Sequence, residues 1–506
     1  MSKKLKLSSF VVLASLVNLA LYQYPFFKFV LATSNTKSLN GVILLLSLVV
    51  ASLLLNALVF YIGLYILRIV GKWLLAILFN ISAIAVYFIN SYGVIIDRTM
   101  IGNVLTSEYE QTTSFFSFGL LLYIVFLGLL PSFFLFKLEV IRPKFKRFLL
   151  HTVLTFILLG FITFANSANW LWIDKNSKTL GGLVMPWSYV VNTSRYYSHK
   201  NKKNKKQILL PDATIKNDEK SVAVLVIGES ARSSNFSLYG YEKNTNPLLS
   251  QIANLKHFKA EACGTSTTTG VKCILEYKNT RKLYETLPNY LFRNDVEVIW
   301  KTTNWGEPTL KVENYQNKKS LRKNCEGPNC GYDEILLNGL KKQILASKKN
   351  KILVVLHTYT SHGPTYYKKY PKQFEKFIPV CKSVELADCT QQELINAYDN
   401  TILYTDYILA TLIDELKQLN EYNTSMIFVS DHGESLGESN LYLHGIPTSL
   451  APKEQLDIPF VVWTSENSRK IKENEEYSQH NIFHSILDFL AIDSPIYDET
   501  MSIYKE

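Results

Sequence analysis

The chain has 506 residues, more than one compact domain usually holds, so at least two structural units are expected. Hydrophobic residues make up 47%, but the long apolar runs lie almost entirely within residues 1–170. The formal net charge is +11, yet there is no zinc-finger spacing, RNA-binding aromatic motif or basic helix suited to a groove, so we expect no nucleic-acid partner.

Five apolar stretches are long enough to cross a bilayer as helices, which takes about 20 residues each. They lie near 9–32, 41–67, 73–96, 116–136 and 148–170. Basic residues flank alternate ends of these stretches, at 3–6, 68–72 and 137–147. Positive charge concentrates in short cytoplasmic loops, which places the N-terminus in the cytoplasm. Because the number of spans is odd, everything after about residue 171 is predicted to lie outside the cytoplasm.

The segment 171–220 is interpreted as a connector, because it holds Gly181, Gly182, Pro186 and a basic run over 199–206. That run is either a solvated linker or a site of attraction for anionic lipid headgroups. The predicted division is therefore a transmembrane domain over 1–170, a connector over 171–220 and an exported domain over 221–506.

All six cysteines lie beyond residue 260, in the part predicted to be exported. They are spaced as three close pairs, Cys263/Cys273, Cys325/Cys330 and Cys381/Cys389. Several pairings are possible in principle, and nearest neighbours are the simplest choice. An even number confined to the exported domain is what an oxidising compartment predicts. No pair has the C-x₂-C spacing of zinc knuckles, which argues against metal binding by cysteine.

Short β-branched runs alternate with helical patterns in the exported part. The runs at 221–227, 296–300, 352–356, 426–429 and 458–462 predict buried parallel strands. Helical patterns lie at 333–348, 391–420 and 480–491. This alternation predicts an α/β fold with a mainly parallel central sheet, whose ligands bind at the carboxyl ends of the strands.

Polar clusters follow three of those runs, and a fourth lies shortly beyond. They contain Glu229, His357, His362, Asp431, His432, Glu434 and His444. Carboxylate and imidazole groups are ligands that zinc accepts. A single histidine after a strand is more often a hydrogen-bonded structural residue. Several such clusters at one edge of one sheet favour a metal site there.

Five consecutive hydroxyl residues, 265–269, lie between Cys263 and Cys273. They could form a flexible loop, or a helix N-terminus, since Ser and Thr favour N-caps. A disulfide between the two cysteines would instead hold the segment rigid, as a nucleophile requires. A threonine hydroxyl needs a metal or a base to react near neutral pH, and a helix starting here would point its N–H groups at a phosphate.

The whole chain resembles the phosphoethanolamine transferases of Gram-negative bacteria, which modify lipid A and related envelope acceptors. The most specific segments are GESARSSNFSLYGY at 228–241, CGTSTTTGVKC at 263–273, LHTYTSHGPTYY at 356–367 and SDHGESLGESNLYLHGIP at 430–447. The resemblance implies a five-helix transmembrane domain in the bacterial inner membrane. It also implies a periplasmic catalytic domain of the alkaline phosphatase/sulfatase-like superfamily.

The resemblance also implies roles for individual residues. Thr267 would be the nucleophile, and one tight zinc would be held by Glu229, Asp431, His432 and the Thr267 oxygen. His362 and His444 would bind a second zinc or the substrate phosphate, with His357 and Glu434 as neighbours. Similar disulfides recur in the family. In the membrane half, Asn103 matches a donor-binding loop, in which Ser107 replaces the family's threonine and Glu110 stands slightly out of register.

The implied reaction transfers phosphoethanolamine from phosphatidylethanolamine to an envelope acceptor through a phosphoethanolamine-threonine intermediate, in a monomeric enzyme. The acceptor stays open between lipid A, lipopolysaccharide core, another glycan and a periplasmic protein. The alternatives are a membrane-tethered sulfatase-like phosphatase, a glycerol-phosphate transferase and a non-enzymatic envelope protein. Residues 263–273 lack the C/S-x-P-x-R motif of sulfatases.

Overall fold

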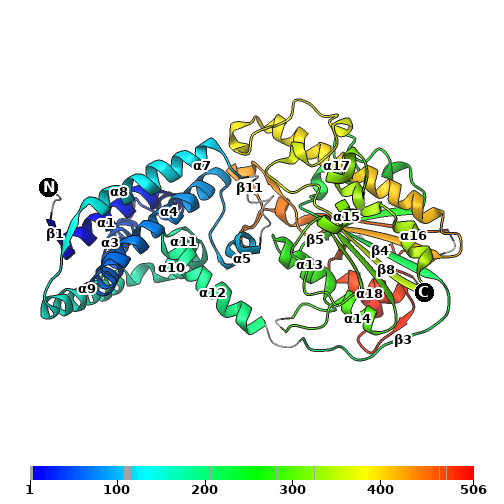
Figure 1. Cartoon of the computed structure of the whole chain (residues 1–506), viewed down its shortest axis with the longest axis horizontal. Coiled ribbons are helices and arrows are strands. Elements are labelled where there is room, and N and C mark those ends of the chain that lie inside the picture. Colours follow the sequence, from blue (N-terminus) through cyan, green and yellow to red (C-terminus); the bar gives the residue numbers. More distant parts are fainter. Residues whose placement is uncertain are drawn as a thin grey trace. The chain divides into compact units, whose positions relative to one another are not determined.

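The computed structural model describes all residues except 1–3, 107–112, 114, 204–206, 281, 324, 467, 474–475 and 506. The chain forms two compact units (Figure 1). The first comprises Met1–Leu105 and Phe116–His199, and the second comprises Thr106–Phe115 and Lys200–Glu506. Residues 171–199, predicted to be part of a connector, fall within the first unit. They form α10 (Trp170–Lys175), α11 (Ser177–Leu183) and most of α12 (Trp187–Lys203).

The first unit contains the apolar helices. Four helices in the described part of the chain are long and apolar enough to span a membrane: α3 (Leu39–Leu67), α4 (Ile69–Tyr92), the helix Phe118–Lys137 and α9 (Phe145–Ala165). The first predicted span is instead a pair, α1 (Leu7–Tyr22) and α2 (Tyr24–Thr33), bent by 63°. Pro25 lies in the first turn of α2 and has no N–H with which to continue α1. The five predicted spans are thus four helices plus one bent pair.

A second proline shapes the helix Phe118–Lys137. This helix consists of α7 (Phe118–Tyr123), a π-helical turn (Ile124–Leu129) and α8 (Leu130–Lys137), with Pro131 at the start of α8. In a regular α-helix the Leu127 carbonyl would accept a hydrogen bond from residue 131, which as proline has no N–H. In the structure this carbonyl accepts the Tyr22 hydroxyl at 2.5 Å. The bond ties the end of α1 to the π-helical turn.

The second unit is built on an eight-stranded sheet of order β13-β5-β12-β9-β4-β8-β6-β7. In chain order the strands are β4 (Ser221–Gly228), β5 (Leu255–Glu261), β6 (Glu297–Thr302), β7 (Asn314–Asn317), β8 (Lys351–His357), β9 (Asn423–Ser430), β12 (Asp457–Thr464) and β13 (Glu476–Ser478). All five predicted runs form strands of this sheet, and β4, β6, β8 and β9 are parallel to their neighbours among these four.

The predicted direction of the run 458–462 is wrong. Its strand, β12, pairs antiparallel with both β9 and β5. A buried apolar run has the same composition in either direction, so the sequence pattern does not reveal it. The connection 431–456 leaves the carboxyl end of β9 and enters β12 at that same edge, which reverses the strand.

Helices cover the sheet. The helices α13 (Thr267–Leu275), α14 (Leu287–Arg293) and α18 (Asn481–Phe489) pack against one face, where Leu225, Ile274 and Ile486 belong to one buried cluster. The long helix α17 (Gln391–Lys417) lies on the opposite side of the sheet (Figure 1) and begins at a capping box formed by Thr390 and Glu393. The predicted helix 333–348 is interrupted by Gly339, whose φ is 67°. It leaves a 3₁₀ turn (Asp333–Leu337) and α16 (Leu340–Ala346).

Candidate active site

The residues that follow β4 and β9 lie next to each other, because the two strands are neighbours in the sheet. β4 and β9 are parallel, with Gly228 opposite Ser430, so the residues just beyond both strands emerge at the same edge of the sheet. The Ser230 N–H donates to Asp431 Oδ1 at 3.0 Å and locks the two strand ends together. Glu229 and Asp431 therefore face a common space.

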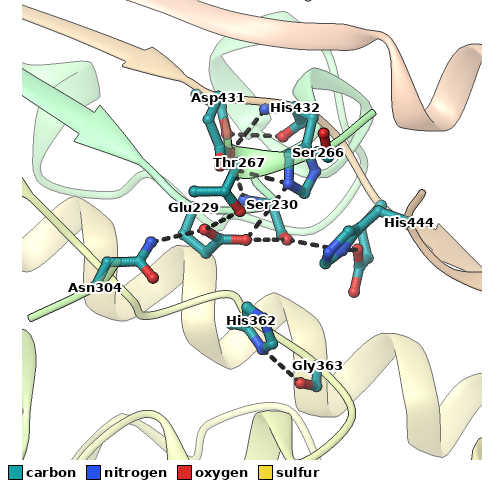
Figure 2. A network of polar contacts seen from close by, with 12 residues as sticks. Glu229, Ser230, Ser266, Thr267, Asn304, His362, Gly363, Asp431, His432 and His444 are labelled. Atoms are coloured by element: carbon teal, nitrogen blue, oxygen red, sulfur yellow. Dashed lines mark hydrogen bonds and ion pairs between the residues drawn. The ribbon is translucent and has the colours of Figure 1, made fainter. Parts of the chain in front are cut away.

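Three side chains converge in that space. His432 Nε2 lies 3.4 Å from Asp431 Oδ2 and 3.6 Å from Glu229 Oε1. The His432 Nδ1–H donates to the Gly433 carbonyl at 2.8 Å, which leaves a lone pair on Nε2. All three side chains are buried. Figure 2 shows Glu229 at the centre of this group, with Asp431 and His432 beside it.

The geometry of this group fits a metal ion. Within the described part of the chain, Asp431 Oδ2 and His432 Nε2 are buried without a hydrogen-bond partner. Buried acceptors left in this way are costly, and a bound cation would satisfy both. Ligands bound tetrahedrally to zinc at 2.0–2.1 Å lie about 3.3 Å apart, close to the spacing seen here. The carboxylate and imidazole donors are also those that zinc takes.

The electrostatics support the same conclusion. Burial raises the pKa of Glu229, but the imidazoles of His432, His362 and His444 outweigh it and hold that pKa well below its usual range. Burial and the nearby Glu229 carboxylate raise the pKa of Asp431 well above its usual range. Two adjacent buried carboxylates cannot both ionise cheaply unless a cation lies between them. A divalent ion is the natural counter-charge.

Thr267 lies at the start of α13, directly against this group. Its hydroxyl donates to Glu229 Oε2 at 3.2 Å (Figure 2). The positive end of the nine-residue helix α13 therefore faces the carboxylates. A Cβ at Gly270 would stand 2.1 Å from the Asp431 carbonyl oxygen, so the glycine lets α13 pack directly on that backbone. The disulfide Cys263–Cys273 closes the loop around Thr267.

The disulfide prediction is confirmed for all three pairs. Cys263–Cys273, Cys325–Cys330 and Cys381–Cys389 are each bonded, and no free cysteine is left.

Two further histidines face the same space from the other side. The ring centroids of His362 and His444 lie 5.6 Å apart, and His444 is 4.2 Å from His432. Burial lowers the pKa of both His362 and His444 to about 3, so each imidazole is neutral near pH 7. With Glu229 they offer three ligand atoms within 4.8 Å of one another.

The Glu434 carboxylate contacts the His444 ring. Its Oε2 lies 2.8 Å from His444 Nδ1, and its Oε1 accepts the Tyr366 hydroxyl at 2.5 Å. Burial raises the pKa of Glu434 to about 8. The structure therefore gathers six of the sequence-predicted residues into one site, namely Glu229, Thr267, His362, Asp431, His432 and His444, with Glu434 behind them.

Asn304 is a site residue that sequence reasoning did not assign. Its Nδ2 donates to Glu229 Oε2 at 2.7 Å (Figure 2) and so fixes the carboxylate. Nδ2 also donates to the Thr358 carbonyl at 2.8 Å. Asn304 lies two residues after β6, at the same sheet edge as Glu229 and Asp431. This position after a predicted strand is the sequence feature that could have identified it as a site residue. His357 is the last residue of β8, and its Nε2 lies 3.2 Å from Asn304 Nδ2. It therefore contacts Asn304.

The sequence also predicted three donor-binding residues in the membrane loop, Asn103, Ser107 and Glu110. Asn103 is in α5 (Arg98–Thr106), within the first unit. Ser107 and Glu110 lie outside the described residues.

Comparison with known proteins gives matches over both units. Residues 221–492 match the sulfatase family model, and residues 53–201 match the model described as phosphoethanolamine transferase EptA/EptB. The chain is 38% identical to phosphoethanolamine transferase EptA of Helicobacter pylori, over 98% of this chain and 96% of that protein. It is 33% identical to phosphatidylethanolamine transferase Mcr-1 of Escherichia coli, over 79% and 80% of the two chains.

A solved structure extends the likeness to the complete fold. The integral membrane lipooligosaccharide phosphoethanolamine transferase A of Neisseria meningitidis superposes with a TM-score of 0.90 and 27% identity, covering 99% of both chains. The two-unit architecture is thus shared over the full length of the chain.

Proposed function

Because this chain belongs to the phosphoethanolamine transferase family, we propose that it moves phosphoethanolamine from phosphatidylethanolamine to an envelope acceptor, with Thr267 as nucleophile. It is a multi-pass protein of the bacterial inner membrane with its catalytic unit in the periplasm. The observation that carries the residue assignment is the hydrogen bond from the Thr267 hydroxyl to Glu229, inside a buried group of unpartnered metal-ligand atoms.

We assign the metal ligands as Glu229, Asp431, His432 and the Thr267 oxygen. Zinc bound there would lower the pKa of the Thr267 hydroxyl and offset charge on the phosphate oxygens. Asn304 and the Ser230 N–H hold the carboxylates of Glu229 and Asp431 in place. Burial of the whole group excludes water from the nucleophile.

The reaction proceeds in two displacements. The Thr267 oxygen attacks phosphorus, the P–O bond to the glycerol breaks, and diacylglycerol leaves with a proton. An acceptor hydroxyl or phosphate oxygen then attacks the phosphoethanolamine-Thr267 ester, and Thr267 recovers its proton. That proton comes from the acceptor hydroxyl or, for a phosphate acceptor, from its P–OH group or from solvent, so that overall one proton passes to diacylglycerol. A lipid donor accounts for the membrane anchor, since a diacylated lipid leaves the bilayer only at high cost.

His362 and His444 face the phosphate position. The His362 ring nitrogen Nδ1 lies 2.6 Å from the Gly363 carbonyl, which requires a proton on Nδ1 and leaves the Nε2 lone pair exposed to the site. A neutral imidazole in that tautomer accepts and cannot donate, so it suits a second zinc better than a phosphate oxygen. Glu229, His362 and His444 would together hold a second zinc, which would offset charge on the transferred phosphate.

The test compares the full-length protein with Thr267→Ala and Thr267→Ser in detergent with phosphatidylethanolamine and lipid A. Diacylglycerol release and modified lipid A are measured by mass spectrometry. Thr267→Ala should abolish both products, and Thr267→Ser should keep part of the activity because it retains a hydroxyl. Undiminished transfer by Thr267→Ala would refute the assignment. Free phosphoethanolamine without any modified acceptor would favour the hydrolase.

A further inference from the structure

Gln479 is a buried amide that lies between two parts of the catalytic site and has no role in the mechanism above. It directly follows β13 and stands shortly before α18, and its side chain has no exposed surface. The next residue, His480, has its Nε2 3.1 Å from Cys273 Sγ, so this segment packs on the disulfide of the nucleophile loop (263–273). A buried primary amide is costly unless its donors and acceptor are paired. Its partners therefore show what the side chain holds.

The Gln479 amide pairs with backbone groups on two sides. Its Oε1 accepts the Cys263 N–H at 2.9 Å. Its Nε2 donates to the Ser430 carbonyl at 2.9 Å and to the Asp431 carbonyl at 2.8 Å. The acceptor and both N–H donors of the amide are thus used. A reversed amide would turn its NH₂ group toward an N–H and its oxygen toward two carbonyls, so these partners fix its orientation.

On one side Gln479 holds the nucleophile loop. Cys263 lies four residues before Thr267 and is bonded to Cys273, which belongs to α13. Both ends of the loop are therefore tied together, and Thr267 is the first residue of α13. A hydrogen bond that fixes the Cys263 backbone thus also constrains the place of the Thr267 oxygen.

On the other side Gln479 holds the backbone of an assigned metal ligand, Asp431. That residue has further contacts of its own, because its N–H donates to the Gly228 carbonyl at 2.9 Å and its Oδ1 accepts the Ser230 N–H at 3.0 Å. The helix α13 approaches the same Asp431 carbonyl closely, since a Cβ at Gly270 would stand 2.1 Å from its oxygen. Asp431 is therefore the fixed side, and the nucleophile loop is the side that Gln479 places.

We propose that Gln479 is a positioning residue that sets the distance between the Thr267 oxygen and the metal site. It acts through the backbone of Cys263 and Asp431 and contributes no ligand of its own. A displacement of about 1 Å at a reacting group can lower a rate by about 100-fold, so a bridge that fixes this spacing supports kcat without binding the donor. The inference rests on the proposed transferase function and adds a residue to it.

The test measures full-length Gln479→Met, which keeps the length of the side chain and removes the amide. Diacylglycerol release in the presence of lipid A gives kcat and the KM for phosphatidylethanolamine. We expect kcat to fall about 10–100-fold, while KM stays within about twofold of the wild-type value. Zinc affinity, titrated against a competing chelator, should stay near that of the wild type, because Asp431 and Glu229 keep their other hydrogen bonds.

Two further variants separate positioning from a loss of stability. Asn400→Leu removes another buried amide, on α17, whose Oδ1 accepts the N–H groups of Lys376 and Phe377 at 2.9 Å each. It should lower the melting temperature and keep kcat. Gln479→Asn keeps an amide that is one methylene too short to join both sides. It perturbs the interior less than Gln479→Met and should show a loss of kcat in the same direction.

Four results would overturn the inference. They are a wild-type kcat in both Gln479 variants, a raised KM with kcat unchanged, an equal loss of kcat in Asn400→Leu, and a loss of zinc affinity of about tenfold or more. The second would make Gln479 a donor-binding residue, and the last would make it a support of the metal ligands. In all four the wild-type protein still releases diacylglycerol and the transferase function stands. Absence of that release in the wild-type protein would instead refute the proposed function, and this inference with it.

Discussion

Asp431 Oδ2 and His432 Nε2 lie 3.4 Å apart in the interior of the catalytic unit, and neither atom has a hydrogen-bond partner among the described residues. Adjacent residues on one chain rarely leave two acceptors buried in this way, because each loses its water without compensation. A cation bound between them would give both atoms a partner. Glu229, whose Oε1 lies 3.6 Å from His432 Nε2, completes a set of donors that suits zinc.

Zinc content should therefore depend on His432. We expect about one tightly bound zinc per wild-type chain, and much less in His432→Ala, because one of the four assigned protein ligands is lost. His257→Ala changes an exposed histidine on β5 and should keep the zinc. Elemental analysis of the purified proteins measures this directly. Equal zinc in His432→Ala and the control would place the metal elsewhere.

Asn304 should tune zinc affinity without touching the metal. Its amide orients Glu229 through the 2.7 Å hydrogen bond, and loss of such supporting contacts typically lowers metal affinity by about 10–100-fold. Asn304→Ala should show a decrease of that size in zinc titrations against a competing chelator. Asn420→Ala, at an exposed position after α17, serves as the control. Wild-type affinity in Asn304→Ala would mean that Glu229 is held by its other contacts.

Asp406 makes the free energy of unfolding depend on pH, and it does so independently of the active site. Its two carboxylate oxygens accept the N–H groups of Leu248 and Leu249 at 3.0 Å each. Burial nevertheless raises its pKa from 3.8 to about 6. Between these values the folded protein keeps a proton that the unfolded chain releases. The free energy of unfolding therefore falls as pH rises through this window, by about 3 kcal/mol in all.

Asp406→Asn should abolish that loss, because the amide does not ionise. The melting temperature of Asp406→Asn should rise relative to wild type as pH goes from about 4 to 7. Asp414→Asn, an exposed position on the same helix, should follow the wild type throughout. A constant difference in melting temperature between Asp406→Asn and wild type across this range would contradict the raised pKa.

Much of this arrangement could be predicted from the sequence. The β-branched runs predicted five strands, and the polar residues after three of them predicted one site, because parallel strands bring their carboxyl ends to one edge. The direction of β12 could not be predicted, since an apolar run is the same in both directions. The bend between α1 and α2 was also not predicted. Proline interrupts helices, but Pro25 lies within a continuous apolar stretch that looks like one span.

The role of Asn304 could not be predicted from the sequence for a different reason. An amide that orients a carboxylate has no motif of its own, and its role exists only once β6 and β4 have been placed in the sheet.

The covalent ester on Thr267 is the central claim, and intact-protein mass spectrometry tests it most directly. Full-length protein incubated with phosphatidylethanolamine and no acceptor should gain the mass of one phosphoethanolamine, and peptide sequencing should place it on Thr267. Added lipid A should remove the adduct, and Thr267→Ala should never acquire it. Transfer to lipid A that proceeds with no adduct, or with the adduct on another residue, would contradict the account.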